Sequence, residues 1–178
     1  MKSGGGKHKG ADFERGVCKR LSLWVSHGAR ADLYWRSAMS GGRATIQRKA
    51  GQRNLSQGGD ISAVGELGHS LTDRYSIECK FVKDLEIASF IIHHRGALMS
   101  YWRQTRRDAA AARKAPLLIA KQNNYPALVL APSAHAEDLG LAAGEDGFPA
   151  TLVSIEGNRV LISLLDRMLE QPYTLDQK

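Results

Sequence analysis

The segment Ile77–Lys80 reads Ile-Glu-Cys-Lys, and it constrains the chain more than any other stretch. In an extended strand, successive side chains point to opposite faces of the sheet, so Glu78 and Lys80 share one face. Asp60, in the preceding Gly-Gly-Asp-Ile segment, is expected on the neighbouring strand beside this pair. Two carboxylates next to a lysine supply hard oxygen ligands for a divalent ion and a cation near a developing negative charge. The combination favours metal-dependent cleavage of a phosphodiester.

The chain is basic, and its charge is unevenly distributed. The 178 residues carry a formal net charge of +7. Positions 1 to 53 contain 12 Lys and Arg residues but only 3 Asp and Glu residues. A second basic cluster comprises Arg103, Arg106, Arg107, Arg113 and Lys114. This asymmetry favours a polyanionic partner, nucleic acid first, over the alternative of a surface that is merely well solvated.

Two further features bear on where such a chain works. Its two cysteines, Cys18 and Cys79, make no disulfide framework, and we expect Cys79 to face away from the carboxylates as a small core residue. No run approaches the roughly 18 apolar residues of a membrane-spanning helix. We therefore expect a cytoplasmic protein without a membrane partner, associated with the nucleoid or encoded by a phage and acting in the host cytoplasm.

Apolar spacing and turn residues divide the chain into an α/β order. A first helix is expected over 11–27, after a flexible basic arm at 1–10. Short strands follow at 33–37, 60–64 and 74–82, with a loop at 43–58 and a turn at 65–68. One long helix is expected over 85–114, with Gly96 as a bend or interruption. Strands at 117–121 and 127–130, a short helix at 134–140 and a hairpin of 150–155 with 159–165 complete the chain.

These elements predict a central mixed β-sheet flanked by helices, with an added C-terminal β-hairpin. We expect a core domain at 11–132 and a C-terminal extension at 133–178 that packs on it. The three tryptophans, Trp24, Trp35 and Trp102, are expected in the core or at a dimer contact.

Four segments resemble the PD-(D/E)XK nuclease superfamily: Gly10–Val17, Trp35–Gly42, Gly59–Ile61 and Ile77–Lys80. Their order looks most like that of the archaeal-type Holliday junction resolvases, which are homodimers with a restriction-endonuclease-like core. The resemblance covers roughly residues 9–121. Glu-x-Lys alone is a weak motif, because an exposed charge pair on a strand is common, but four segments in order are more specific.

The resemblance implies roles for individual residues. Asp60 and Glu78 would be the metal-binding carboxylates, and the backbone carbonyl of Cys79 a further ligand. Lys80 would orient the attacking water or stabilise its hydroxide form. Glu14 would complete the metal shell directly or through a water, although it could instead be an ordinary first-turn helix residue. The implied ion is Mg²⁺, with Mn²⁺ as a substitute.

The implied substrate is DNA, with contacts from the basic N-terminal half. Ser40 matches a serine near the active site of the family, and the neighbouring glycines let the backbone approach a phosphate closely, although a simple turn is the alternative. The expected DNA-binding residues are Lys7, Lys9, Arg15, Arg36, Ser40, Gly41, Gly42, Arg43, Arg48, Lys49 and Arg53, and Lys121 is a weaker candidate.

The chain also departs from the resolvase pattern. The links at 43–58 and 65–73 are longer than usual there, and the C-terminal hairpin is additional, which leaves the DNA substrate open. A Mg²⁺-dependent endonuclease selective for four-way or other branched DNA is the leading prediction. The alternatives are a sequence-specific homing or restriction enzyme or phage DNA-processing endonuclease of the same fold, and a non-catalytic DNA-binding protein.

Overall fold

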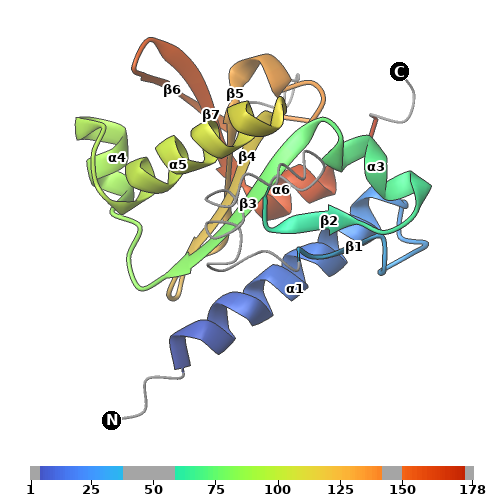
Figure 1. The fold of residues 1–178 in the computed structure, drawn as a ribbon. Helices are drawn as coiled ribbons and strands as arrows, with labels where there is room; N and C mark the ends of the chain where they lie inside the picture. Colours follow the sequence, from blue (N-terminus) through green and yellow to red (C-terminus); the bar gives the residue numbers. More distant parts are fainter. Residues whose placement is uncertain (1–4, 38–58, 142–149, 175–178) are drawn as a thin grey trace.

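Helices cover both faces of a mixed five-stranded sheet in the computed structural model of the chain (Figure 1). The structure describes residues 5–37, 59–141 and 150–174. The strand order is β3-β4-β5-β7-β6; β3 and β4 are parallel, and the other neighbours are antiparallel. These strands are β3 (Tyr75–Val82), β4 (Ala115–Gln122), β5 (Leu128–Pro132), β6 (Ala150–Ile155) and β7 (Asn158–Leu164). The predicted α/β architecture with a mixed sheet and a C-terminal hairpin is confirmed.

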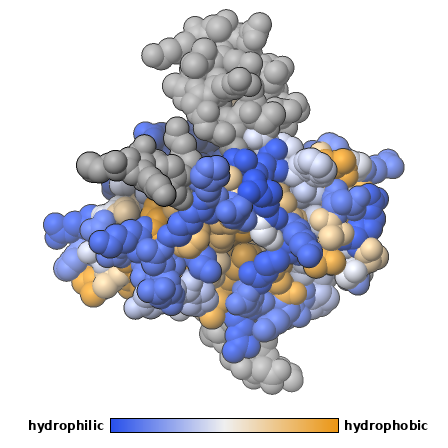
Figure 2. All heavy atoms as spheres, turned by 90° about the horizontal axis from the view of Figure 1, so that it is seen from below, coloured by the Kyte–Doolittle hydropathy of each residue, from blue (hydrophilic) through white to orange (hydrophobic). Residues whose placement is uncertain are grey.

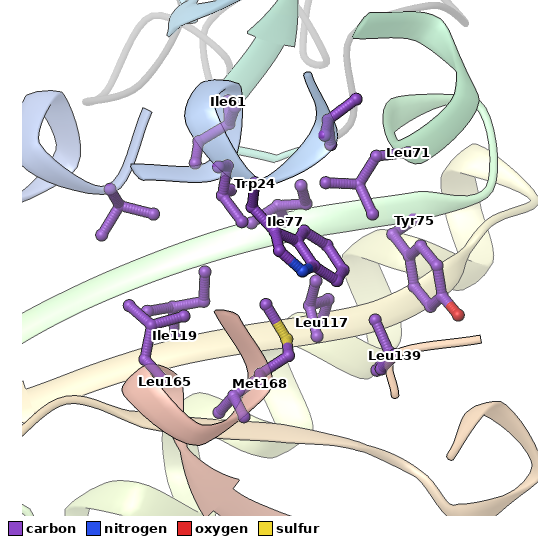
Figure 3. Packing of buried hydrophobic residues seen from close by; sticks show 14 of the residues in the cluster. Trp24, Ile61, Leu71, Tyr75, Ile77, Leu117, Ile119, Leu139, Leu165 and Met168 are labelled. Atoms are coloured by element: carbon purple, nitrogen blue, oxygen red, sulfur yellow. The ribbon is translucent and has the colours of Figure 1, made fainter. Parts of the chain in front are cut away.

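Two separate apolar clusters lie on the two faces of this sheet. The buried strand β4 supplies both, because Leu117 and Ile119 face one cluster while Leu118 and Ala120 face the other. The first cluster includes Trp24 of α1 (Gly5–Val25) and Met168 of α6 (Leu165–Glu170), as Figure 3 shows. The second cluster contains residues of α4 (Ile87–His93) and α5 (Ala97–Ala112). Strand β4 is therefore the centre of the hydrophobic core.

The first helix is longer than the sequence predicts. It begins at Gly5 rather than Ala11, so residues 5–10 of the segment predicted as a flexible arm are helical. Glycines are poor helix formers, which is why residue types alone did not predict this start. The buried side of α1 carries Val17, Leu21 and Val25, the period expected for one apolar face. The outward side of the molecule around α1 is largely hydrophilic (Figure 2).

One link between elements differs from the prediction, and another agrees with it. The segment after β2 (Ile61–Ala63) forms a helix, α3 (Glu66–Thr72), where a turn over 65–68 was expected. Leu71 anchors it in the core. The helical stretch predicted over 85–114 is interrupted at Gly96, as expected, and forms two helices. The backbone at His94 and Gly96 has φ of 52° and 96°, which cannot continue a right-handed helix.

The residues after β5 continue the main sheet, because β7 pairs with β5 and β6 pairs with β7. A 3₁₀ turn, η1 (Ser133–His135), begins the segment predicted as a short helix over 134–140. Asp138 follows it and is buried, where its carboxylate pairs with Arg74 just before β3. Helix α6 begins at Leu165, the residue at which the second hairpin strand was expected to end. Within the described residues, no helix is long and apolar enough to cross a membrane.

A small second sheet attaches to the edge of the main one. Strand β1 (Tyr34–Arg36) pairs antiparallel with β2, and Gly59 just before β2 forms a parallel bridge with Ile77 of β3. Gly59 has φ of 98°, and a Cβ built on it would lie 2.8 Å from Ile77 N and 3.0 Å from Ile77 C. Only glycine lets the backbone come this close, and the next residue is Asp60.

We predict that Gly59→Ala destabilises the protein by at least ~2 kcal/mol, because the methyl group meets backbone that cannot move aside. Urea denaturation measures the change. Gly28→Ala is the matched control, since Gly28 also has a positive φ, 88°, but a Cβ there meets nothing within 4 Å. Equal losses in the two variants would show that the backbone conformation matters and the close approach to β3 does not.

Candidate active site

Asp60 lies against the strand that carries Glu78 and Lys80. Its backbone N–H donates to Ile77 O at 2.7 Å, and its Oδ2 accepts a hydrogen bond from the Cys79 N–H at 2.9 Å. Asp60 is thereby held beside β3 through both its backbone and its carboxylate. The predicted neighbourhood of Asp60, Glu78 and Lys80 therefore exists in the structure.

Glu78 and Lys80 are paired on the face of β3 that they share. Lys80 Nζ donates to Glu78 Oε1 at 2.7 Å, and Glu78 is only 8% exposed. Burial lowers the pKa of the Lys80 ammonium, but the charge and hydrogen bond of Glu78 outweigh it, so the pKa is raised. Lys80 also lies 5.7 Å from the ring centre of Tyr101 on α5. It is thus a fixed cation and hydrogen-bond donor at neutral pH.

Asp60 is the carboxylate of this site whose pKa is shifted. Burial, followed by the negative charge of Glu78, raises the pKa of Asp60 from 3.8 to about 7. The Cys79 N–H and the Lys80 ammonium act in the opposite direction but do not compensate. Two close carboxylates share one lysine here, which leaves an excess of negative charge that a bound cation would relieve.

Glu14 lies near the same group but is engaged elsewhere. Its charge contributes to the raised pKa of Asp60, so the two carboxylates interact. Its Oε2 accepts from Nε of Arg36 on β1, and its side chain is 14% exposed. The structure therefore brings Glu14 close to the predicted set while giving it an arginine partner that the sequence did not reveal. This pair joins α1 to β1, and residue spacing within a single helix or strand cannot predict a contact between two elements.

Both cysteines are buried in the core, as expected for Cys79. Burial raises the pKa of the Cys79 thiol well above its usual value, and burial together with the charge of Glu14 raises the pKa of Cys18 to about 11. Neither thiol is therefore a ready metal ligand or nucleophile.

The site offers few side-chain ligands to a metal ion. Among residues 5–37, 59–141 and 150–174, no three His, Cys, Asp or Glu side chains gather closely enough to hold a metal by themselves. Asp60 and Glu78 remain as a pair of hard oxygen donors. A pair suits an ion that completes its shell with waters and substrate phosphate, as Mg²⁺ does.

The predicted DNA-binding residues fall into two groups. Arg36 pairs with Glu14, Arg15 pairs with Asp12 on the surface of α1, and Lys9 contacts the Asn123 side chain. Lys7 lies in α1. The remaining predicted contacts lie outside the described residues: Ser40, Gly41, Gly42, Arg43, Arg48, Lys49 and Arg53.

One cluster beside the site joins two lysines that the sequence had suggested as DNA contacts to an aromatic ring that it had not singled out. Lys9 lies 3.8 Å from the ring centre of Phe81, the residue after Lys80, and Lys121 lies 5.6 Å from the same ring. Phe13 packs on this ring from α1 at 5.4 Å. The register of β3 and β4 places Phe81 opposite Lys121, and a correct prediction of this register would have shown that the two residues are neighbours. These lysines lie on the side of β3 opposite Lys80.

The tryptophans behave differently from one another. Trp24 and Trp102 are buried, as expected. Trp35 on β1 is 64% exposed, so the core position is wrong for it, and the alternative of a dimer contact stays a prediction. A three-residue edge strand exposes alternate side chains, and Trp35 is the outward one between Tyr34 and Arg36.

A mixed sheet between helices, with Asp60 before one strand and Glu78-x-Lys80 on the next, defines a nuclease of the PD-(D/E)XK class with a restriction-endonuclease-like fold. The chain belongs to the family described as "Phage putative PDDEXK endonuclease", whose model matches residues 5–160. No significant match was found among curated proteins or among solved structures. The match to the superfamily confirms the class, and it does not extend to the archaeal junction resolvases.

The raised pKa of Asp60 makes a prediction about stability without divalent ions. The folded state holds the Asp60 proton up to a pH of about 7 while the unfolded state loses it near 3.8, so stability falls as pH rises between these values. Asp60→Asn removes the charge and keeps an acceptor for the Cys79 N–H. We expect it to stabilise the protein at pH 8 in a chelator by roughly 2–4 kcal/mol, at about 1.4 kcal/mol per pKa unit.

Urea denaturation at pH 5 and pH 8 measures this effect, and the gain of Asp60→Asn over the wild type must grow between the two pH values. Asp12→Asn serves as the control, because Asp12 is an exposed carboxylate on α1. A gain that is the same at both pH values, or that the control reproduces, contradicts the prediction.

Proposed function

We propose that this protein is a divalent-metal-dependent DNA endonuclease, with Mg²⁺ as the first choice of ion and Mn²⁺ as a substitute, that prefers four-way or other branched DNA. The observation that carries the proposal is the juxtaposition of Asp60 and Glu78 with a lysine 2.7 Å from one of them. A protein that only binds DNA has no use for two like charges held together in a partly buried place. This argues against the non-catalytic alternative.

The donor set fits the proposed ion. Asp60 and Glu78 would hold it, with the Cys79 carbonyl as a further proposed ligand and Glu14 acting through a water. The raised pKa of Asp60 marks the charge that the ion would balance. When bound, a divalent ion lowers the pKa of a water and neutralises charge on the phosphate.

The residues of the chain would position the reacting groups. Lys80 is fixed by Glu78 through one of its protons, which leaves its other protons to hold and orient a water next to the scissile phosphate. Because its pKa is raised, Lys80 stays charged and acts as a donor and not as a base. Arg36 would hold the Glu14 side chain toward Asp60, through the ion pair that joins α1 to β1.

The proposal of a branched substrate rests on the resemblance to junction resolvases, and so does that of a homodimer with two active sites on opposite strands. The exposed Trp35 on β1 is a candidate contact for such a partner or for the DNA. Lys9 and Lys121 beside Phe81 would supply phosphate contacts on the other side of β3 from Lys80. The protein would act in the cytoplasm, on nucleoid or phage DNA.

Metal binding is testable without any cleavage. We predict that millimolar Mg²⁺ raises the melting temperature of the wild type at pH 8, because an ion that binds only the folded state stabilises it by mass action. Asp60→Asn should lose most of this rise, and Asp12→Asn should keep it. Thermal denaturation with Mg²⁺ or with chelator provides the measurement. An equal rise in all three proteins would mean that the ion does not bind at Asp60.

Cleavage of an immobile four-way junction and of a linear duplex of the same sequence tests the activity. We predict paired nicks in the junction, with Lys80→Ala reducing the rate by roughly 10³-fold or more, a loss typical of removing a group that stabilises transition-state charge. Arg167→Ala, on the exposed side of α6, is the control. Equal cutting of both substrates would favour a general or sequence-directed endonuclease of this fold. No cutting of either would refute the enzymatic proposal.

A further inference from the structure

A basic groove of about 580 Å³ runs between α5, the ends of β4 and β5, and the β6–β7 turn. Its cationic lining comprises Arg103, Arg106, Arg107 and Lys114. Pro116 and Pro132 line it too, and Ala110 on the α5 side leaves room for a ligand. We refer to this feature as the α5 groove.

The α5 groove has more positive than negative charge. Glu156 of the β6–β7 turn is the acidic residue among those that line it, and both of its oxygens are engaged. Arg103 donates to Oε1 through Nε at 2.8 Å and Nη2 at 2.6 Å, and Arg106 donates to Oε2 at 3.3 Å. One carboxylate therefore orients two guanidinium groups while neutralising only one of them.

The other two cations are not neutralised by this carboxylate. Lys114 Nζ donates to the backbone carbonyl of Thr72 at 2.6 Å, which fixes the ammonium but leaves its charge. Arg107 is exposed, and no ion pair to it is found in the part of the chain that the structure describes. Pre-oriented cations around an open groove are the chemistry that recognises successive phosphates of a nucleic-acid backbone.

The α5 groove is separated from the candidate active site by the body of α5. Tyr101, which lies 5.7 Å from Lys80, marks the side of the helix toward the active site. With 3.6 residues per turn, Arg103 and Arg107 project on the opposite side of α5 from Tyr101. Side chains included, a helix is about 10 Å across. A DNA segment seated at Glu78 and Lys80 on β3 therefore does not fill the α5 groove. Figure 1 shows α5 lying across the sheet, which has β3 at one edge and the β6–β7 hairpin at the other.

We propose that the α5 groove binds the phosphate backbone of a second DNA segment, one arm of a branched molecule whose other arm occupies the active site. The inference deepens the proposed function and rests on it for the choice of DNA. Glu156 is a positioning residue here, because it holds Arg103 and Arg106 toward the groove and tethers the hairpin to α5. The C-terminal hairpin thereby has a use that the nuclease core alone does not supply.

Binding measurements in the Lys80→Ala background test this inference without cleavage. The substrates are the four-way junction and a linear duplex as long as one pair of its arms. Arg107→Glu reverses a groove charge, and Ala110→Glu places a carboxylate in the groove at an exposed helical position that accepts glutamate. Arg167→Glu makes the same charge change as Arg107→Glu on α6, which packs on the opposite face of the sheet.

We expect both groove variants to weaken junction binding about tenfold or more, and to reduce the salt dependence of log K by about one unit of slope per lost phosphate contact. Duplex binding should change no more than in the Arg167→Glu control. Equal weakening for junction and duplex would overturn the inference, since one duplex would then cross α5. No effect beyond the control would also overturn it. Absence of cleavage by the wild type would refute the proposed function, while these binding results would still decide the inference.

Discussion

The candidate active site depends on one backbone contact, the bridge between Gly59 and Ile77. It brings the small β1–β2 sheet to the edge of β3, and the residue that follows, Asp60, then reaches the Cys79 amide with its carboxylate. Glu78 lies one residue away on β3, so two negative charges are held together before any ion arrives. The raised pKa of Asp60 is the electrostatic consequence of that contact. The cation proposed for this site would relieve the repulsion between the two carboxylates.

The rest of the molecule holds this edge in place. Strand β4 pairs with β3 over eight residues and is buried on both faces, so its side chains anchor α1 below and α5 above. Helix α1 brings Glu14 to the same edge and β1 supplies Arg36 to pair with it. The candidate catalytic residues therefore all lie between Glu14 and Lys80 in the sequence, whereas the residues after β3 form most of the sheet and the α5 groove.

Sequence reasoning predicted the parts governed by short-range rules. The alternation of Ile77, Glu78, Cys79 and Lys80 indicated β3 and its two faces, and the Glu156-Gly157 turn indicated the hairpin. It failed where distant packing decides: α3 forms because Leu71 is buried in the core, and α1 begins at Gly5 despite its glycines. The Arg36–Glu14 pair and the neighbours of Phe81 join separate elements, so no local pattern reveals them.

The position of β3 at the edge of the five-stranded sheet has a consequence for solubility. An edge strand exposes unpaired amide and carbonyl groups, and in the described chain the outer side of β3 is bonded at Ile77 and Cys79 by Asp60, next to the Gly59 bridge. With apolar residues at its polar positions as well, this strand would be a site for aggregation, because it already carries Ile77, Phe81 and Val82. Glu78 and Lys80 interrupt it with charge, and charged residues on an edge discourage the addition of a strand from another molecule. The two charged residues proposed for catalysis thus also oppose the pairing of β3 with a strand of another molecule.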